Sequence, residues 1–103
     1  VLLPMNAFTS STSGSAVITV LEPGHGRSTG DTVRFRTVEA FDGFTEAVLE
    51  SSSGYSITVV AGDASTDFQS AFYTFTASSG TSTVGNVLGG GSVATAGPVS
   101  ITK

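Results

Sequence analysis

The sequence contains no cysteine and no tryptophan, one histidine, and four lysine or arginine residues among its 103 residues. Without cysteine, the chain has no disulfide scaffold, no cysteine-ligated metal site and no cysteine nucleophile. Four scattered basic residues, in a chain of net charge −4, cannot assemble the basic patch that nucleic acids or anionic membranes require. No window approaches the ~18 apolar residues of a membrane-spanning helix. We therefore expect a soluble domain with no nucleic-acid and no membrane partner.

Hydroxyl-bearing residues and glycine take the place of charge. The chain has 16 serines, 15 threonines and 13 glycines, and only 12% of its residues are charged. Such a composition keeps β-strands soluble through hydroxyl groups, and a chain of this length forms one small domain with a modest core. Val1–Pro4 precedes the first methionine, Met5, so either the natural chain begins at Met5 or the sequence is part of a longer protein.

Alternating apolar and polar residues, rich in β-branched and aromatic types, predict β-structure almost throughout. The expected strands are residues 16–21, 32–38, 55–60 and 72–76, with weaker ones at 92–95 and 99–102. In residues 39–53, the spacing of Phe41, Phe44, Ala47 and Val48 fits one or two helical turns; the alternative is a long loop or short strand anchored by the two phenylalanines. The pattern predicts an all-β fold: a small single-domain barrel or sandwich of five to seven short, mostly antiparallel strands.

The same periodicity predicts the domain organisation and the core. Residues 1–15 are expected to be a flexible lead-in, residues 16–88 the β-domain, and residues 89–103 a glycine-hinged C-terminal strand or arm. That last segment either closes its own domain or adds a strand to a neighbouring subunit. Shared period-2 alternation assigns one interior face, closed by Ile18 or Val17, to Val33, Phe35, Tyr55, Ile57, Val59, Tyr73 and Phe75.

A structural turn is predicted at Pro23, Gly24, His25, Gly26, Gly30 and Asp31. Pro23-Gly24 is a turn pair, and we expect Gly26 or Gly30 to have a positive φ. His25 is the only imidazole, and with Ser28 and Asp31 it lies within seven residues. A local turn rarely places nucleophile, base and orienting carboxylate around a substrate. We therefore interpret His25 and Asp31 as groups that stabilise the turn.

Other candidate chemistry is weak. Gly24, Gly26 and Gly30 lack the following helix and the Lys-Ser/Thr pair of a phosphate-binding loop. The segment from Gly62 to Asp67 lacks the alternating oxygen ligands of a calcium loop, so Asp63 and Asp67 are interpreted as solvated turn carboxylates. The sequence therefore predicts no catalytic residue, no metal site and no cofactor, and the chain is not expected to be an enzyme.

The run from Ile18 to Phe35, which contains Pro-Gly-His-Gly followed by Gly-Asp-Thr-Val, resembles a β-module that recurs in tailed-bacteriophage virion proteins. That module is often likened to the FCCH domain of ubiquitin-activating enzymes. The similarity continues through the strand that begins at Tyr55, the Tyr73-Thr74-Phe75 strand and the glycine-rich exit at residues 89–91, and covers residues 16–93. Arg27 departs from the pattern, which usually has a hydrophobic residue there, and the insert between Val38 and Tyr55 is long.

The resemblance implies a structural component of a phage virion, in a tail, hub, nozzle, fibre or decoration protein. It implies localisation in the virion, contacts with other virion proteins and with copies of itself, and a homo-oligomer, but no catalytic residue. The alternative is a carbohydrate- or host-surface-binding β-module that uses exposed aromatic side chains, Tyr73 among them. The residues expected to make intermolecular contacts are Phe41, Phe44, Phe72, Val93, Val99 and Ile101.

Overall fold

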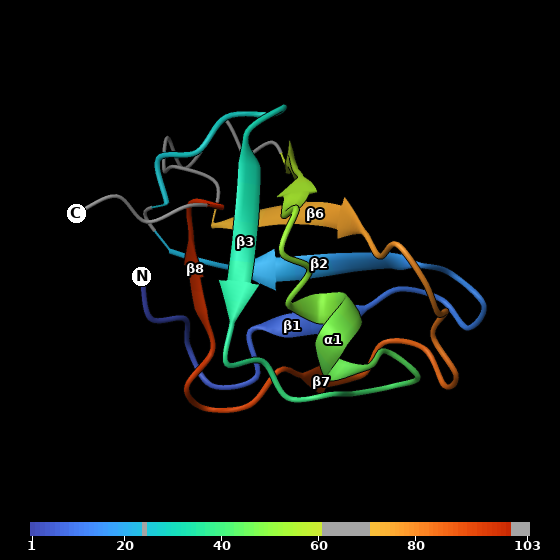
Figure 1. Cartoon of the computed structure of the whole chain (residues 1–103). Helices are drawn as coiled ribbons and strands as arrows, with labels where there is room; N and C mark the ends of the chain where they lie inside the picture. The colour runs from blue at the N-terminus through green and yellow to red at the C-terminus, as the bar shows by residue number, and fades with distance from the viewer. Residues whose placement is uncertain (24, 61–70, 100–103) are drawn as a thin grey trace.

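The computed structural model describes residues 1–23, 25–60 and 71–99, and shows an all-β domain (Figure 1). Its elements are β1 Phe8–Ser10, β2 Val17–Leu21, β3 Thr32–Arg36, α1 Glu46–Leu49, β4 Tyr55–Ser56, β5 Thr58–Val59, β6 Phe72–Thr76, β7 Leu88–Gly89 and β8 Thr95–Gly97. They form a five-stranded sheet in the order β5-β6-β2-β1-β7 and a three-stranded sheet in the order β4-β3-β8. Every named pair is antiparallel, which confirms the predicted fold class.

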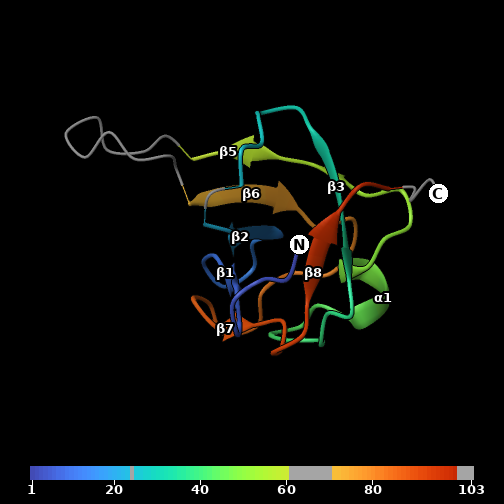
Figure 2. The same ribbon diagram turned by 90° about the vertical axis from the view of Figure 1, so that its left-hand side faces the viewer.

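The two sheets pack against each other with their strands crossing. The five-stranded sheet lies on one side and β3 and β8 on the other, as the view turned by 90° shows (Figure 2). The expected single strand at residues 55–60 joins them: β4 belongs to the smaller sheet and β5 to the larger. Ile57, between the two, is 1% exposed. A strand that passes from one sheet to the other closes this edge of the fold.

The core lies between the sheets and contains the predicted interior face. Val33, Phe35, Tyr55, Ile57, Tyr73 and Phe75 are all buried, and Val59 is half-buried. Ile18 is fully buried whereas Val17 is exposed, which decides between the two candidates for closing the core. Alternation along five-residue strands was sufficient to assign these faces because one face of each sheet is packed.

Aromatic rings fill the centre of this core. Phe8 lies edge-on to Phe35 at a centroid distance of 5.0 Å and to Phe75 at 6.3 Å. Tyr55 stacks on Phe75 at 4.5 Å. Edge-on and offset arrangements of this kind are the favourable ones for aromatic pairs. The rings therefore connect β1 and β6 of the large sheet to β3 and β4 of the small sheet.

The N-terminal segment differs from the predicted lead-in. β1 is an interior strand of the large sheet, between β2 and β7, and Phe8 is fully buried. Residues 1–3 run beside β8, where the Leu3 N–H donates to the Ala94 carbonyl at 2.9 Å. The prediction missed β1 because a three-residue strand with one large apolar side chain has no measurable alternation.

The C-terminal segment, as far as it is described, pairs within its own chain. β7 pairs with β1 and β8 pairs with β3, so residues 88–97 follow the alternative in which the chain closes its own domain. The second predicted strand, residues 99–102, falls mostly outside the described residues. Gly89 and Gly90 lie against the rings of Phe41 and Phe8, where a Cβ atom would approach ring carbons to 2.3 Å and 2.5 Å. These glycines therefore provide close packing.

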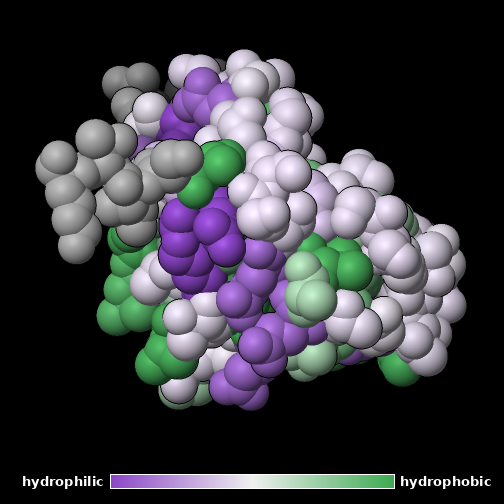
Figure 3. Space-filling view, viewed as in Figure 1, coloured by the Kyte–Doolittle hydropathy of each residue, from purple (hydrophilic) through white to green (hydrophobic). Residues whose placement is uncertain are grey.

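The segment between Val38 and Tyr55 contains a single helical turn, α1, which answers the question that its spacing left open. Thr45 caps α1, with its Oγ1 accepting a hydrogen bond from the Val48 N–H at 3.3 Å. Leu49, the last residue of α1, is fully buried. In the same view as Figure 1, hydrophilic residues gather in a band near β3, and apolar residues form separate patches to either side of it (Figure 3).

Candidate functional site

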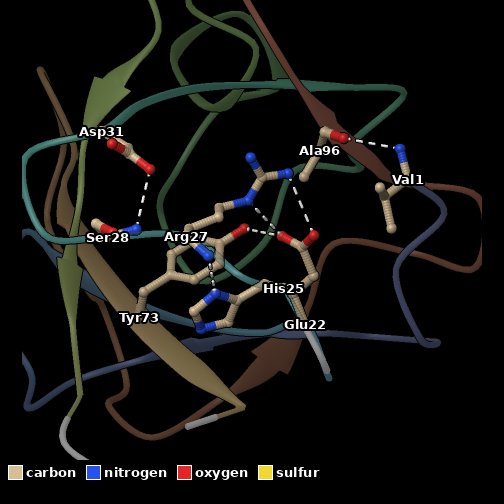
Figure 4. Close-up of polar contacts among 8 residues, drawn as sticks. All are labelled: Val1, Glu22, His25, Arg27, Ser28, Asp31, Tyr73 and Ala96. Carbon is tan, nitrogen blue, oxygen red and sulfur yellow. Dashed lines mark hydrogen bonds and ion pairs between the residues drawn. The ribbon is translucent and has the colours of Figure 1, made fainter. Parts of the chain in front are cut away.

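The turn between β2 and β3, where the sequence predicts a structural turn, holds a cluster of polar contacts (Figure 4). Gly26 has φ +66° and Gly30 φ +97°, so the prediction of a positive φ in this turn is confirmed at both positions. Gly24 lies outside the described residues, and Pro23 is exposed. Asp31 accepts a hydrogen bond from the Ser28 N–H at 2.9 Å, as expected of an Asx-type turn before a strand.

A buried ion pair and a buried phenol lie at the centre of this turn. Glu22 Oε1 accepts a hydrogen bond from Arg27 Nε at 3.0 Å, and Glu22 Oε2 accepts one from Arg27 Nη2 at 3.2 Å. The side chains are 3% exposed for Glu22 and 19% for Arg27. Tyr73, fully buried on β6, donates its hydroxyl to Glu22 Oε1 at 2.5 Å. The carboxylate therefore has three charge-assisted hydrogen bonds in place of water.

Burial and pairing set the ionisation of this cluster. Burial, followed by the hydrogen bond to Glu22 and its negative charge, raises the pKa of Tyr73, so its hydroxyl stays a donor. Burial alone would lower the pKa of Arg27, but the hydrogen bond and charge of Glu22 outweigh it and raise that pKa. Sequence reasoning treated Arg27 only as a departure from the family pattern. Glu22 lies only five residues before Arg27, so this opposite-charge pair was a local signal that could have been read from the sequence. Tyr73 was missed because it lies 51 residues away from Glu22.

His25 is engaged in the same turn. Its Nδ1 accepts a hydrogen bond from the Arg27 backbone N–H at 2.7 Å, and its ring lies edge-on to Tyr73 at 5.2 Å. An accepting Nδ1 places the proton of neutral His25 on Nε2. Nε2 is buried and has no hydrogen-bond partner among the residues that the structure describes. This geometry fits the interpretation of His25 as a group that stabilises the turn, because the nitrogen facing Arg27 is occupied by the backbone.

A second polar centre, at Asp42, was not predicted as a site. Its carboxylate accepts hydrogen bonds from Ser10 Oγ at 2.6 Å, Ser82 Oγ at 2.5 Å and the Val84 N–H at 2.8 Å. The bonds from Ser10 and Ser82, with those from the Val84 and Gly85 N–H groups, lower the pKa of Asp42. Asp42 thus ties β1 to the loop before β7. Its one sequence signal is the Asp42-Gly43 pair, both members of which have positive φ.

The residues expected to make intermolecular contacts are not gathered on one surface. Phe44 is 2% exposed and Phe41 is half-buried, and the two form a β-bridge across their own loop. Phe44 is therefore a core residue, and so is Tyr73, which corrects the expectation that both are exposed. Phe72 is 44% exposed and Val93 52% exposed, while Val99 is half-buried. Ile101 lies outside the described residues, as do Asp63 and Asp67.

In the part of the chain that the structure describes, no three histidine or acidic side chains are grouped closely enough to hold a metal ion. No described helix has the length and apolarity needed to cross a membrane. No protein-family model, curated protein or solved structure matches this chain.

Proposed function

We propose that the chain is a structural β-module of a tailed-bacteriophage virion that acts through protein–protein contacts and performs no catalysis. The observation that carries the proposal is the state of the turn between β2 and β3. This is the segment with the family resemblance, and its titratable side chains are bonded to one another or to the backbone. Glu22 is engaged by Arg27 and Tyr73, His25 by the Arg27 N–H, and Asp31 by the Ser28 N–H.

A turn built in this way stabilises a fold and leaves neither Glu22 nor the Nδ1 of His25 free to act as a base on a substrate. A catalytic base needs an accessible lone pair within hydrogen-bond reach of the proton that it removes. Here the Nδ1 lone pair of His25 is occupied at 2.7 Å, and Nε2 carries the proton and is buried. The proposed module therefore contributes a rigid scaffold whose outer surfaces contact other virion proteins and further copies of the chain.

Mass spectrometry of purified virions from the phage that encodes the chain tests this function directly. We expect peptides of this chain at a fixed, symmetric copy number per particle, and cross-links from its surface to other virion proteins. Electron microscopy of the same particles would then place the module in the tail, hub, nozzle, fibre or decoration layer. Absence of these peptides from intact, infectious particles would refute the proposal.

A further inference from the structure

A row of threonines crosses the outer face of the five-stranded sheet. The strand register places Thr58 opposite Thr74, Thr74 opposite Thr19, Thr19 opposite Thr9, and Thr9 opposite Leu88. Residues directly opposite in an antiparallel sheet have their side chains on the same face. The buried residues Val20 and Tyr73 alternate with this row, so it points away from the core. One position on each of the five strands therefore contributes to a continuous row.

Uncharged pairs flank the row on both sides. Leu21 lies opposite Phe72 two residues along the strands in one direction, and Val17 lies opposite Thr76 in the other. Val17 is 36% exposed, Phe72 44% and Leu88 65%. We name the nine residues of the row and these two pairs the threonine face. It combines methyl groups and hydroxyls and contains no charged side chain.

The charges of the described chain lie elsewhere. They occur in the turn between β2 and β3 (Glu22 to Asp31), on β3 at Arg34 and Arg36, and between Glu39 and Glu50. The hydrophilic surface around β3 in Figure 3 belongs to the opposite side of the domain. Since the chain has a net charge of −4, two copies repel each other. As far as the described residues go, the threonine face is a surface on which two copies can approach without juxtaposing like charges.

We propose that the threonine face is the surface through which a second copy of this chain stacks on the first. A threonine hydroxyl both donates and accepts, so a row of threonines is complementary to itself. A two-fold axis parallel to the strands, between β2 and β6, sets Thr19 of each copy opposite Thr74 of the other. The same axis sets Leu21 opposite Phe72, so apolar side chains meet on one flank of the threonine row.

The size of the threonine face determines how strong this contact can be. The nine residues of the threonine face each cover about 4.8 Å by 6.8 Å of the sheet, which makes on the order of 300 Å² per copy. Stable dimers bury roughly 800 Å² per partner. The isolated contact is therefore weak, with a dissociation constant of about 0.1–1 mM, and becomes effective where an assembly holds many copies together. The inference rests on the proposed structural function and names its contact surface.

Sedimentation velocity of the full chain from about 20 μM to 1 mM tests the proposal over the expected range of affinity. We expect a reversible monomer–dimer equilibrium that strengthens with added salt, because salt screens the repulsion between copies. Thr19→Lys and Thr74→Lys should weaken association at least about tenfold, since each brings one ammonium group from each copy close to the two-fold axis, in a contact with no charge to pair with them. Thr58→Lys, at the exposed edge strand, provides a further variant if a central one fails to fold.

Thr32→Lys is the matched control, because it makes the same substitution at an exposed position on β3, in the other sheet. It should associate as the wild type does, and circular dichroism should show that all variants are folded. A wild-type chain that stays monomeric at 1 mM, or equal association of Thr19→Lys and Thr32→Lys, would overturn the proposal. The proposal would also be overturned if a neutral oligosaccharide bound to the monomer and shifted the methyl resonances of the threonine row, because the face would then bind a sugar. Association through this face combined with absence from virions would refute the virion function alone.

Discussion

The ion pair between Glu22 and Arg27 provides the sharpest test of how the turn is stabilised. Arg27→Met removes two of the three hydrogen bonds to a carboxylate that is 3% exposed, and leaves only the Tyr73 hydroxyl. Removing one partner of a buried pair costs about 3–5 kcal/mol, because the other charge stays buried without compensation. Arg27 is itself 19% exposed, so water can partly replace it, and we expect a loss near 3 kcal/mol.

Such a loss is a large part of the 5–15 kcal/mol that stabilises a typical domain, and urea denaturation measures it readily. Glu22→Gln should cost about 1–2 kcal/mol, since the amide oxygen still accepts from Tyr73. The double variant Glu22→Gln/Arg27→Met should lose less than the sum of the two single losses, by about 1–3 kcal/mol of coupling. Arg36→Met is the control, because its guanidinium donates to the Pro98 and Val99 carbonyls outside the core.

The control should lose no more than about 1 kcal/mol. The reasoning would be refuted if Arg27→Met lost less than about 1 kcal/mol, or if the two single losses were simply additive. Either result would mean that Glu22 reaches water in solution, so that the turn is looser than the 3% exposure of its carboxylate indicates.

Four further predictions concern other parts of the fold. Phe35→Ala should cost about 3–5 kcal/mol in chemical denaturation, because its fully buried ring contacts three other aromatic rings. Gly30→Val should cost more than about 1 kcal/mol, because valine is strained at the φ of +97° that Gly30 adopts, even though an added Cβ would meet no atom within 4 Å. Gly30→Asn should recover part of that stability. Asp42→Asn should be destabilising at pH 7, and the difference from the wild type should shrink as the pH falls below about 4, because hydrogen bonds lower the pKa of the folded carboxyl. Deletion of residues 90–103 should unfold the monomer by circular dichroism, since it removes β8; a folded monomer that no longer associates would instead support an exchanged arm.

The sequence predicted best what short-range periodicity determines. Val33 and Phe35 alternate with Arg34 and Arg36. A half-buried strand places the two apolar side chains in the core and the two arginines toward water. The prediction from sequence failed where a partner far away in the chain determines the structure. Phe8 is fully buried because its short strand lies between β2 and β7. The residues next to Phe8 in the sequence do not indicate that either strand will pair with it.

The candidate site divides in the same way. The positive φ of Gly26 and Gly30 follows from local turn chemistry, and it was predicted. Arg27 pairs with the nearby Glu22, but the Tyr73 hydroxyl that completes the bonding of Glu22 is brought by the fold from β6. Asp42 likewise receives hydrogen bonds from Ser10 and Ser82, which lie 32 and 40 residues away in the sequence. Polar residues that bind distant partners leave no periodic signal, whereas residues that face a core do.

The placement of the few charged residues connects the stability of the domain to its proposed contacts. Glu22 and Arg27 neutralise each other inside the turn, and Asp42 is held by hydroxyl and backbone groups of its own domain. The Glu22–Arg27 pair has no net charge, so it stabilises the fold without adding to the repulsion between neighbouring copies. A sheet face without charge ordinarily carries a risk of uncontrolled association. Here, threonine hydroxyls at the centre of the face keep it hydrated in the monomer, so the contact stays weak and reversible until an assembly supplies many copies.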